Sequence, residues 1–175
     1  AAMSAIAGFP PHISVVLKKV RGITMPKAKQ YNPSEIKGLS EANIIPLIDP
    51  ALIVGESLHF ADGRLFTTDA SLLHIDLVRT LDDIEFRLRA GLIGLIGDAR
   101  ITKPGLTLLK VTTDGILGPL KRNAVIDDYT IGIPVLDILE TPQAVWTPTE
   151  QNIVTTARAN RTVDMTVTIT YGPAV

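Results

Sequence analysis

The feature that most constrains the fold is a run of apolar residues at helical spacing in the middle of the chain. Leucine and isoleucine recur every three or four residues from Leu77 to Leu95, and charged residues fill six of the thirteen positions between them. Such a stripe is typical of an amphipathic helix that packs one face against a core. We therefore expect a long helix from about Asp76 to Ile96, with the rest of the domain organised around it.

Two further segments carry helix signals. Residues 32–43 begin with Asn-Pro-Ser-Glu, a capping residue followed by proline and an acidic residue, which predicts a short helix. Residues 104–114 also begin with proline and are followed by Gly115, a common helix stop. Glycines at 91, 94 and 97 close the long helix, where they indicate close backbone packing and do not form a phosphate-binding loop.

Short stretches rich in β-branched residues predict strands, and an Asp62-Gly63 pair predicts a hairpin turn. The expected strands are 13–20, 44–48, 52–54 and 58–60 around Gly55, 129–136 and 163–171. Residues 141–152 are expected to form a loop, with one helical turn as an alternative within it. The fold class predicted from these elements is α+β, with a mixed β-sheet packed against a long central helix and a second, shorter helix, and with extended terminal strands or arms.

The clearest strand lies at residues 163–171, where apolar and polar residues alternate strictly. One face carries Val163, Met165, Val167, Ile169 and Tyr171. The other face carries Asp and Thr. After this strand comes a Gly-Pro turn with no second strand, so we expect its partner to come from another subunit or from residues beyond the end of the sequence.

Composition excludes several classes of function. The 175 residues have a net charge of −1, which gives no indication of a nucleic-acid partner. There is no cysteine, and His12, His59 and His74 do not have metal-ligand spacing. No apolar run reaches the roughly 18 residues of a membrane span. We expect no enzyme activity, no catalytic or metal-binding residues and no cofactor, although a small α/β ligand-binding domain with an unrecognised site is an alternative.

An acidic group lies on the long helix at Asp82, Asp83 and Glu85. Paired carboxylates can perform acid–base chemistry when burial separates their pKa values. Here they alternate with arginines, and Asp83–Arg87 and Glu85–Arg89 are i,i+4 pairs of the favourable order. We therefore interpret this group as a solvated or intersubunit charged face.

The order of the elements resembles that of a known family. The segments that carry the resemblance are 33–42, 43–48, 63–67, 75–85, 115–118 and 166–175. Over residues 10–175 their order is similar to that of the C-terminal domain of contractile tail sheath proteins. These proteins occur in contractile bacteriophages, R-type bacteriocins and related contractile injection systems. The resembling segments leave no room for the variable outer domains that many sheath proteins insert, so we expect either a minimal sheath protein or a fragment of one.

The resemblance implies a mechanical function. Such subunits stack as hexameric rings around an inner tube, and terminal arms add strands to the sheets of neighbours. Contraction then drives the tube through a target envelope. The implied partners are further copies of the chain, the tube protein and the baseplate, without nucleic acid, in a virion tail or contractile particle made in the bacterial cytoplasm. The alternative within the family is a baseplate or tail-terminator component with a sheath-like domain.

The resemblance also assigns parts of the chain to these contacts. Residues 1–22 would form an N-terminal arm and strand, 23–162 a core domain, and 163–175 a C-terminal strand or arm. The residues expected to contact neighbouring subunits are those of the two terminal strands: Ile13, Val15, Leu17, Val163, Met165, Val167, Ile169 and Tyr171.

Overall fold

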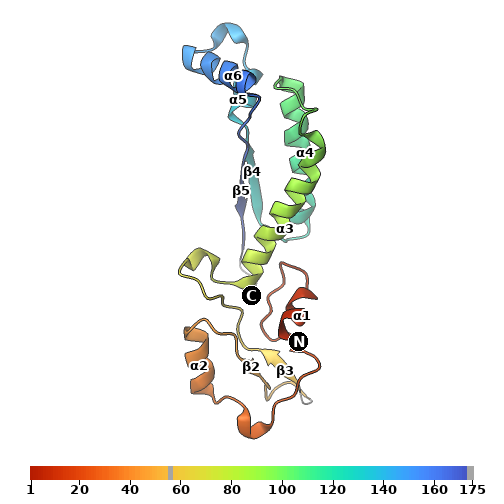
Figure 1. Cartoon of the computed structure of the whole chain (residues 1–175), viewed down its shortest axis with the longest axis vertical. Helices are drawn as coiled ribbons and strands as arrows, with labels where there is room; N and C mark the ends of the chain where they lie inside the picture. Colours follow the sequence, from red (N-terminus) through yellow and green to blue (C-terminus); the bar gives the residue numbers. More distant parts are fainter. Residues whose placement is uncertain (55–56, 173–175) are drawn as a thin grey trace. The chain divides into compact units, whose positions relative to one another are not determined.

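The computed structural model describes residues 1–54 and 57–172, which form two compact units. Of these residues, 1–83 belong to unit 1 and 84–172 to unit 2. The boundary falls inside helix α3, Ile75–Leu92 (Figure 1). The expected α+β class is confirmed, although both sheets are antiparallel and neither is mixed. The expected division into an N-terminal arm, a core domain and a C-terminal arm describes how the chain would contact its neighbours, and it stays a prediction.

Unit 1 is built on a small sheet in which three very short strands pair antiparallel in the order β1-β3-β2. The strands are β1 Lys19–Val20, β2 Leu47–Ile48 and β3 Leu58–Phe60. The helices of this unit are α1 Ala2–Ala7, α2 Pro33–Glu41 and the first part of α3, with single 3₁₀ turns at Lys27–Lys29 and Ala70–Leu72. The predicted capped helix is confirmed, because Asn32 and Glu35 form a reciprocal capping box.

The core of unit 1 explains why residues 13–20 are not one strand. Val15 and Val20 are both buried in the same cluster as Phe60. Residues five apart on a regular strand point to opposite faces, so burying both requires a bend between them. The bend is at Leu17, which has a φ of 56° and donates its N–H to the Phe60 carbonyl at 2.8 Å. Only the last two residues of the segment therefore pair as β1.

The other strands of unit 1 are also shorter than predicted. Residues 44–48 reduce to β2, and residues 52–54 form a turn and bend, while Gly55 lies outside the described residues. Asp62-Gly63 does not close a hairpin. The Asp62 carboxylate accepts the Gly63 N–H at 2.7 Å, and Arg64 pairs with His74 in an isolated bridge across a wider loop.

Unit 2 contains longer elements. After α3 comes a 3₁₀ turn, Ile93–Leu95, and the remaining elements are α4 Lys103–Arg122, β4 Asp128–Gly132, α5 Pro134–Glu140, a 3₁₀ turn Gln143–Val145, α6 Pro148–Asn160 and β5 Thr166–Thr170. The predicted long helix is confirmed to within a few residues. Gly91 supports it by close packing, because a Cβ there would lie 2.5 Å from the Ile116 side chain.

The second helix, α4, does not stop at Gly115. Its buried face continues through Leu117 and Leu120, so packing outweighs the cost of a glycine in a helix, which is about 1 kcal/mol. Gly115 has no atom within 4 Å of the position of a Cβ, so it lies on the open side of the helix. At 20 residues, α4 extends well past the end expected at residue 114. Because the 3₁₀ turn Ile93–Leu95 continues α3 directly, the first helical segment remains the longer of the two, as expected.

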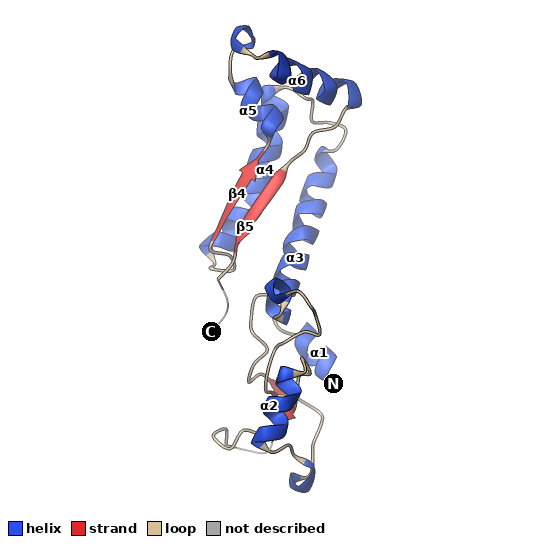
Figure 2. Ribbon diagram, turned by 90° about the vertical axis from the view of Figure 1, so that its left-hand side faces the viewer, coloured by secondary structure: helices blue, strands red, loops and turns tan. Residues whose placement is uncertain are grey.

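The C-terminal strand finds its partner within the chain. β4 and β5 pair antiparallel over five residues each, with Thr130 opposite Thr168 at the centre (Figure 2). Val167 and Ile169 of β5 pack on the cluster that α4 supplies, whereas Thr166, Thr168 and Thr170 are exposed. The predicted alternation is thus confirmed, but the expectation that the strand has no partner in its own chain is wrong.

Two helices of unit 2 were not expected. The strand predicted for 129–136 ends at Gly132, because Pro134 starts α5 at its first turn. The loop predicted for 141–152 contains the start of α6, where Thr147 and Glu150 form a capping box. This motif repeats the Pro-x-Glu pattern at Asn32, which would have predicted the helix.

Candidate assembly surfaces

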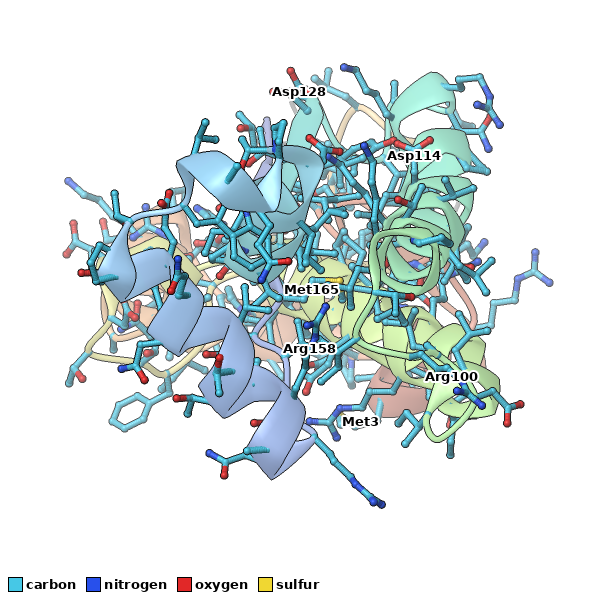
Figure 3. All side chains as sticks on the ribbon, turned by 90° about the horizontal axis from the view of Figure 1, so that it is seen from above. Met3, Arg100, Asp114, Asp128, Arg158 and Met165 are labelled. Carbon is cyan, nitrogen blue, oxygen red and sulfur yellow. The ribbon has the colours of Figure 1, made fainter. Side chains whose placement is uncertain are left out.

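The residues expected to contact neighbours do not share one environment. Val15 is fully buried in unit 1. Val163 and Met165 pack beside a core cluster that includes Leu106 and Leu136, and the Met165 sulphur lies 3.6 Å from the Thr113 hydroxyl (Figure 3). The remaining five are Ile13 and Tyr171, which are partly covered, Val167 and Ile169, which face the α4 core, and Leu17, which is 54% exposed. A role in intersubunit contact stays a prediction for the set.

The two-stranded sheet of unit 2 offers backbone to a neighbour. Among the described residues, β4 pairs only with β5, so each strand keeps one edge without a β partner. Open edges present unpaired N–H and C=O groups that can accept another strand. Neither strand contains a lysine or proline that would block such pairing. This sheet is therefore the best candidate in the described chain for strand addition.

Charged groups border this sheet at β4. The Tyr129 hydroxyl donates to Asp114 of α4 at 2.6 Å, and this hydrogen bond raises the pKa of Tyr129. Lys121 donates to Asp128 at 2.7 Å and holds the pKa of that carboxyl below its usual value. Both contacts tie β4 to α4, so the sheet is held on one face while its other face stays exposed.

The acidic group of α3 behaves as a charged helix face. Asp82 and Glu85 are exposed, and Glu85 forms the expected ion pair with Arg89. Asp83 and Arg87 each have a partner, although their pairing with one another stays a prediction. None of these carboxylates lines either of the two cavities described below.

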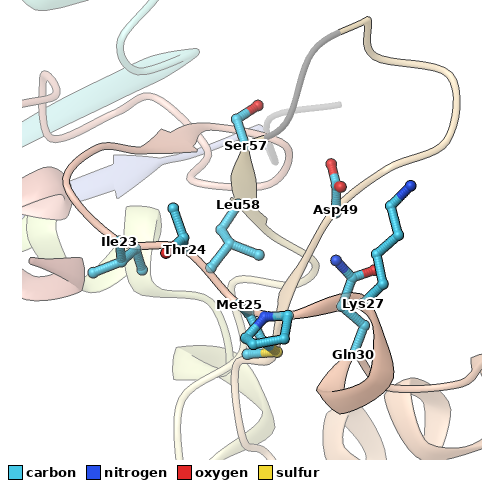
Figure 4. Close-up of a pocket in the computed structure, with 9 residues that line it drawn as sticks. Ile23, Thr24, Met25, Lys27, Gln30, Asp49, Ser57 and Leu58 are labelled. Carbon is cyan, nitrogen blue, oxygen red and sulfur yellow. The ribbon is translucent and has the colours of Figure 1, made fainter.

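One cavity of about 340 Å³ lies in unit 1 (Figure 4). Its described lining mixes apolar residues such as Met25 and Leu58 with polar ones, and Lys27 and Asp49 are the charged groups. A single carboxylate without a histidine or second carboxylate lacks the paired groups of acid–base catalysis. The lining gives no support to the small enzyme alternative.

A second cavity of about 600 Å³ lies between α1 and β1 and does reach His59. That imidazole is 5% exposed, and its Nδ1 lies 3.2 Å from the carbonyl oxygen of Ser57, which immediately precedes β3. The other charged side chains of the lining are Lys18, Lys19 and Arg21, with no carboxylate among the described residues. Such a cavity suits a negatively charged group, and it lacks the acid partner a catalytic histidine uses.

Residues 1–54 and 57–172 contain neither a metal-binding cluster nor a membrane-spanning helix. In these ranges no three His, Cys, Asp or Glu residues are grouped so that they could hold a metal ion. None of the helices there combines the length and apolar character needed to cross a bilayer.

Comparison with solved structures identifies the class of fold. No family model matches the sequence, and neither does any curated protein. The chain is similar to a chain of the anti-feeding prophage (AFP) baseplate, with a TM-score of 0.72 and 11% identity over 98% of this chain and 44% of that one. It is also similar to the AFP helical sheath in its contracted state, with a TM-score of 0.69 and 11% identity over 98% and 45%.

These similarities show a sheath-like fold of the kind found in contractile injection systems. The expectation drawn from the order of elements is confirmed at the level of fold. The chain spans less than half the length of the structures it matches. At 11% identity, the particular role of the chain does not follow from the fold alone.

Proposed function

We propose that this chain is a structural subunit of a contractile sheath, which stacks as hexameric rings around an inner tube and contracts to drive the tube through a target envelope. The observation that carries the proposal is similarity over 98% of the chain to a chain of a helical sheath. The proposed partners are further copies, a tube protein and a baseplate, within a contractile particle or virion tail assembled in the bacterial cytoplasm.

Strand addition is the proposed means of assembly. The open edges of β4 and β5 would accept an extended segment from a neighbouring copy, which supplies backbone hydrogen bonds in the mode of β-augmentation. The five-residue β4–β5 pairing within one chain supports this, because it holds both strands extended and leaves a row of backbone N–H and C=O groups on each outer edge. Rigid-body movement of subunits joined in this way would allow contraction without an enzymatic step.

The test is electron microscopy of the purified chain at high concentration, with hydrogen exchange before and after assembly. We expect rings or tubes, and slower amide exchange in β4 and β5 on assembly, with unchanged exchange in helix α2 of the other unit as the control. A well-behaved monomer at high concentration would contradict the proposal.

A second candidate is a baseplate component with the same fold. The observation that favours it is the similarity to a baseplate chain, which is as extensive as that to the sheath. Copy number per particle separates the two. A sheath subunit forms many stacked rings, whereas a baseplate component is present in only the number of copies that makes one or a few rings.

A further inference from the structure

The cavity between α1 and β1, here called the α1–β1 pocket, combines apolar and cationic lining. Phe9 and Leu17 provide apolar surface, and Lys18, Lys19 and Arg21 provide three positive charges. Among the described residues, none of the three cationic side chains has an ion pair, and no carboxylate lines the pocket. The pocket therefore presents uncompensated positive charge beside an apolar surface.

Leu17 is held in an unusual conformation at this pocket. Its φ of 56° lies in the left-handed region, which leucine rarely adopts, and its side chain is 54% exposed. Residues held in such sparsely populated backbone conformations cluster at functional sites, where the surrounding fold maintains them. This observation is independent of the charges and points to the same surface.

Charge is segregated along the chain in a way that suggests the occupant. Residues 1–34 contain five lysine or arginine residues and no acidic residue. Residues 123–157 contain five acidic residues and no lysine or arginine. The near-neutral net charge of the whole chain thus results from two oppositely charged segments, and each copy carries both halves of a complementary pair.

Within the acidic segment, the two carboxylates of α5 are available to a partner. Asp128 is bound by a lysine of α4, and Glu150 caps α6. Asp137 and Glu140 are both exposed on α5, and no ion pair engages either of them within the described chain. Val145, which is 67% exposed, follows shortly after them and provides an apolar contact.

We propose that the α1–β1 pocket of one copy binds the acidic end of α5, with Asp137, Glu140 and Val145, from a neighbouring copy. The contact joins two different surfaces, so it is heterologous and generates rings or helical filaments when repeated. This inference rests on the proposed function for its neighbouring copies, and it names the interface that the fold comparison leaves open.

Charge reversal on each side tests the contact. We expect K19E/R21E and D137K/E140K each to weaken self-association by about tenfold or more, because like charges then face one another. Mixing the two variants in equal amounts should restore association, since each reversed surface then meets a complementary one on the other copy. Sedimentation velocity at low and high salt measures both effects, and wild-type association should weaken with salt.

Matched controls change the same number of charges elsewhere. K27E/K29E alters the same basic segment outside the α1–β1 pocket, and D98K/D164K alters exposed acids outside the acidic segment. Both controls should associate like the wild type. All the substituted side chains are exposed, and circular dichroism confirms that each variant keeps its fold.

The outcomes separate this inference from the proposed function. If the wild type forms rings or tubes but the mixture of the two variants does not regain association, the proposed contact is contradicted and the sheath role is not. Recovery in the mixture, with only small oligomers visible in images, would support the contact and count against the sheath role. Controls that weaken association as much as the test variants would overturn the contact, because net charge alone would then explain the effect.

Discussion

The two units of this chain are stabilised in different ways. Unit 2 has long elements, with a 20-residue helix and a five-residue strand ladder packed on two apolar clusters. Unit 1 has strands of two or three residues around one cluster of four buried side chains. Its path depends on single contacts, such as the bend at Leu17 and the hydrogen bond from Arg79 to the Phe9 carbonyl at 2.6 Å. Periodic packing determines unit 2, and individual backbone contacts determine unit 1.

The largest effect should come from the core of unit 2. Leu117 is fully buried on α4, so Leu117→Ala should lower the free energy of unfolding by about 2–5 kcal/mol through lost burial and a residual cavity. Urea denaturation measures the change. Leu108→Ala is the control on the same helix, because that side chain is 49% exposed and should lose less than about 1 kcal/mol. Equal losses would show that the helix faces are assigned wrongly.

Glycines of α4 should respond in opposite directions. A Cβ at Gly105 would overlap the Arg100 backbone carbonyl, so Gly105→Ala should destabilise the fold by about 1–3 kcal/mol. Gly115 faces open space in the middle of the helix, so Gly115→Ala should stabilise it by about 0.5–1 kcal/mol. Thermal unfolding of the two variants measures both signs. A destabilised Gly115→Ala would mean that α4 ends where the sequence first indicated.

The N-terminal caps of α2 and α6 should contribute similar amounts to the stability of the two units. Thr147→Ala in unit 2 and Asn32→Ala in unit 1 each remove a side chain that accepts a backbone N–H of the first helical turn. Each should lower stability by about 1 kcal/mol. Helix content and the urea midpoint measure the loss, and Ser34→Ala is a control one position before the capping glutamate in α2. A much larger loss in unit 1 would show that its helix depends more on local contacts.

The α6 cap should also depend on pH. Hydrogen bonds from the backbone and side chain of Thr147 hold the pKa of Glu150 below its usual value of 4.5. A lowered pKa in the folded state contributes stability that is present above pH 4.5 and is lost as the pH falls through the folded value. The wild type should therefore lose more stability below pH 4.5 than Glu150→Gln, as followed by urea denaturation. Parallel pH curves for the two proteins would contradict this assignment.

The smallest effect concerns the strained bend of unit 1. Leu17→Gly removes the steric penalty of a left-handed leucine, about 1–2 kcal/mol, and adds the entropy cost of glycine, about 0.5–1 kcal/mol. A net gain of about 0.5 kcal/mol is expected from thermal unfolding. A clear loss of stability would show that the Leu17 side chain contributes packing that its exposure does not reveal.

The sequence predicted the elements whose signal is periodic or local. The stripe from Leu77 to Leu95 gave α3, the capping box at Asn32 gave α2, and strict alternation gave β5. It did not predict that α4 continues through Gly115, because the buried contacts that extend the helix come from residues distant in sequence. For the same reason, alternation identified β5 as a strand but not β4 as its partner.

The candidate surfaces were predicted less well. The sequence drew attention to apolar residues of the terminal strands, but burial within the chain occupies Val15 and covers most of Val167. What remains for a neighbour is backbone at the open edges of β4 and β5, which side-chain patterns do not report. The charge segregation between residues 1–34 and 123–157 was visible in the sequence, but the unpaired state of its side chains required the structure.

The most direct test of the sheath-like assembly is electron cryomicroscopy of the particle formed by the purified chain. We expect stacked six-membered rings in which an extended segment of a neighbouring copy lies along the open edge of β4 or β5. The result that would contradict this account is a monomer at high concentration, or an assembly in which both edges of this sheet face solvent.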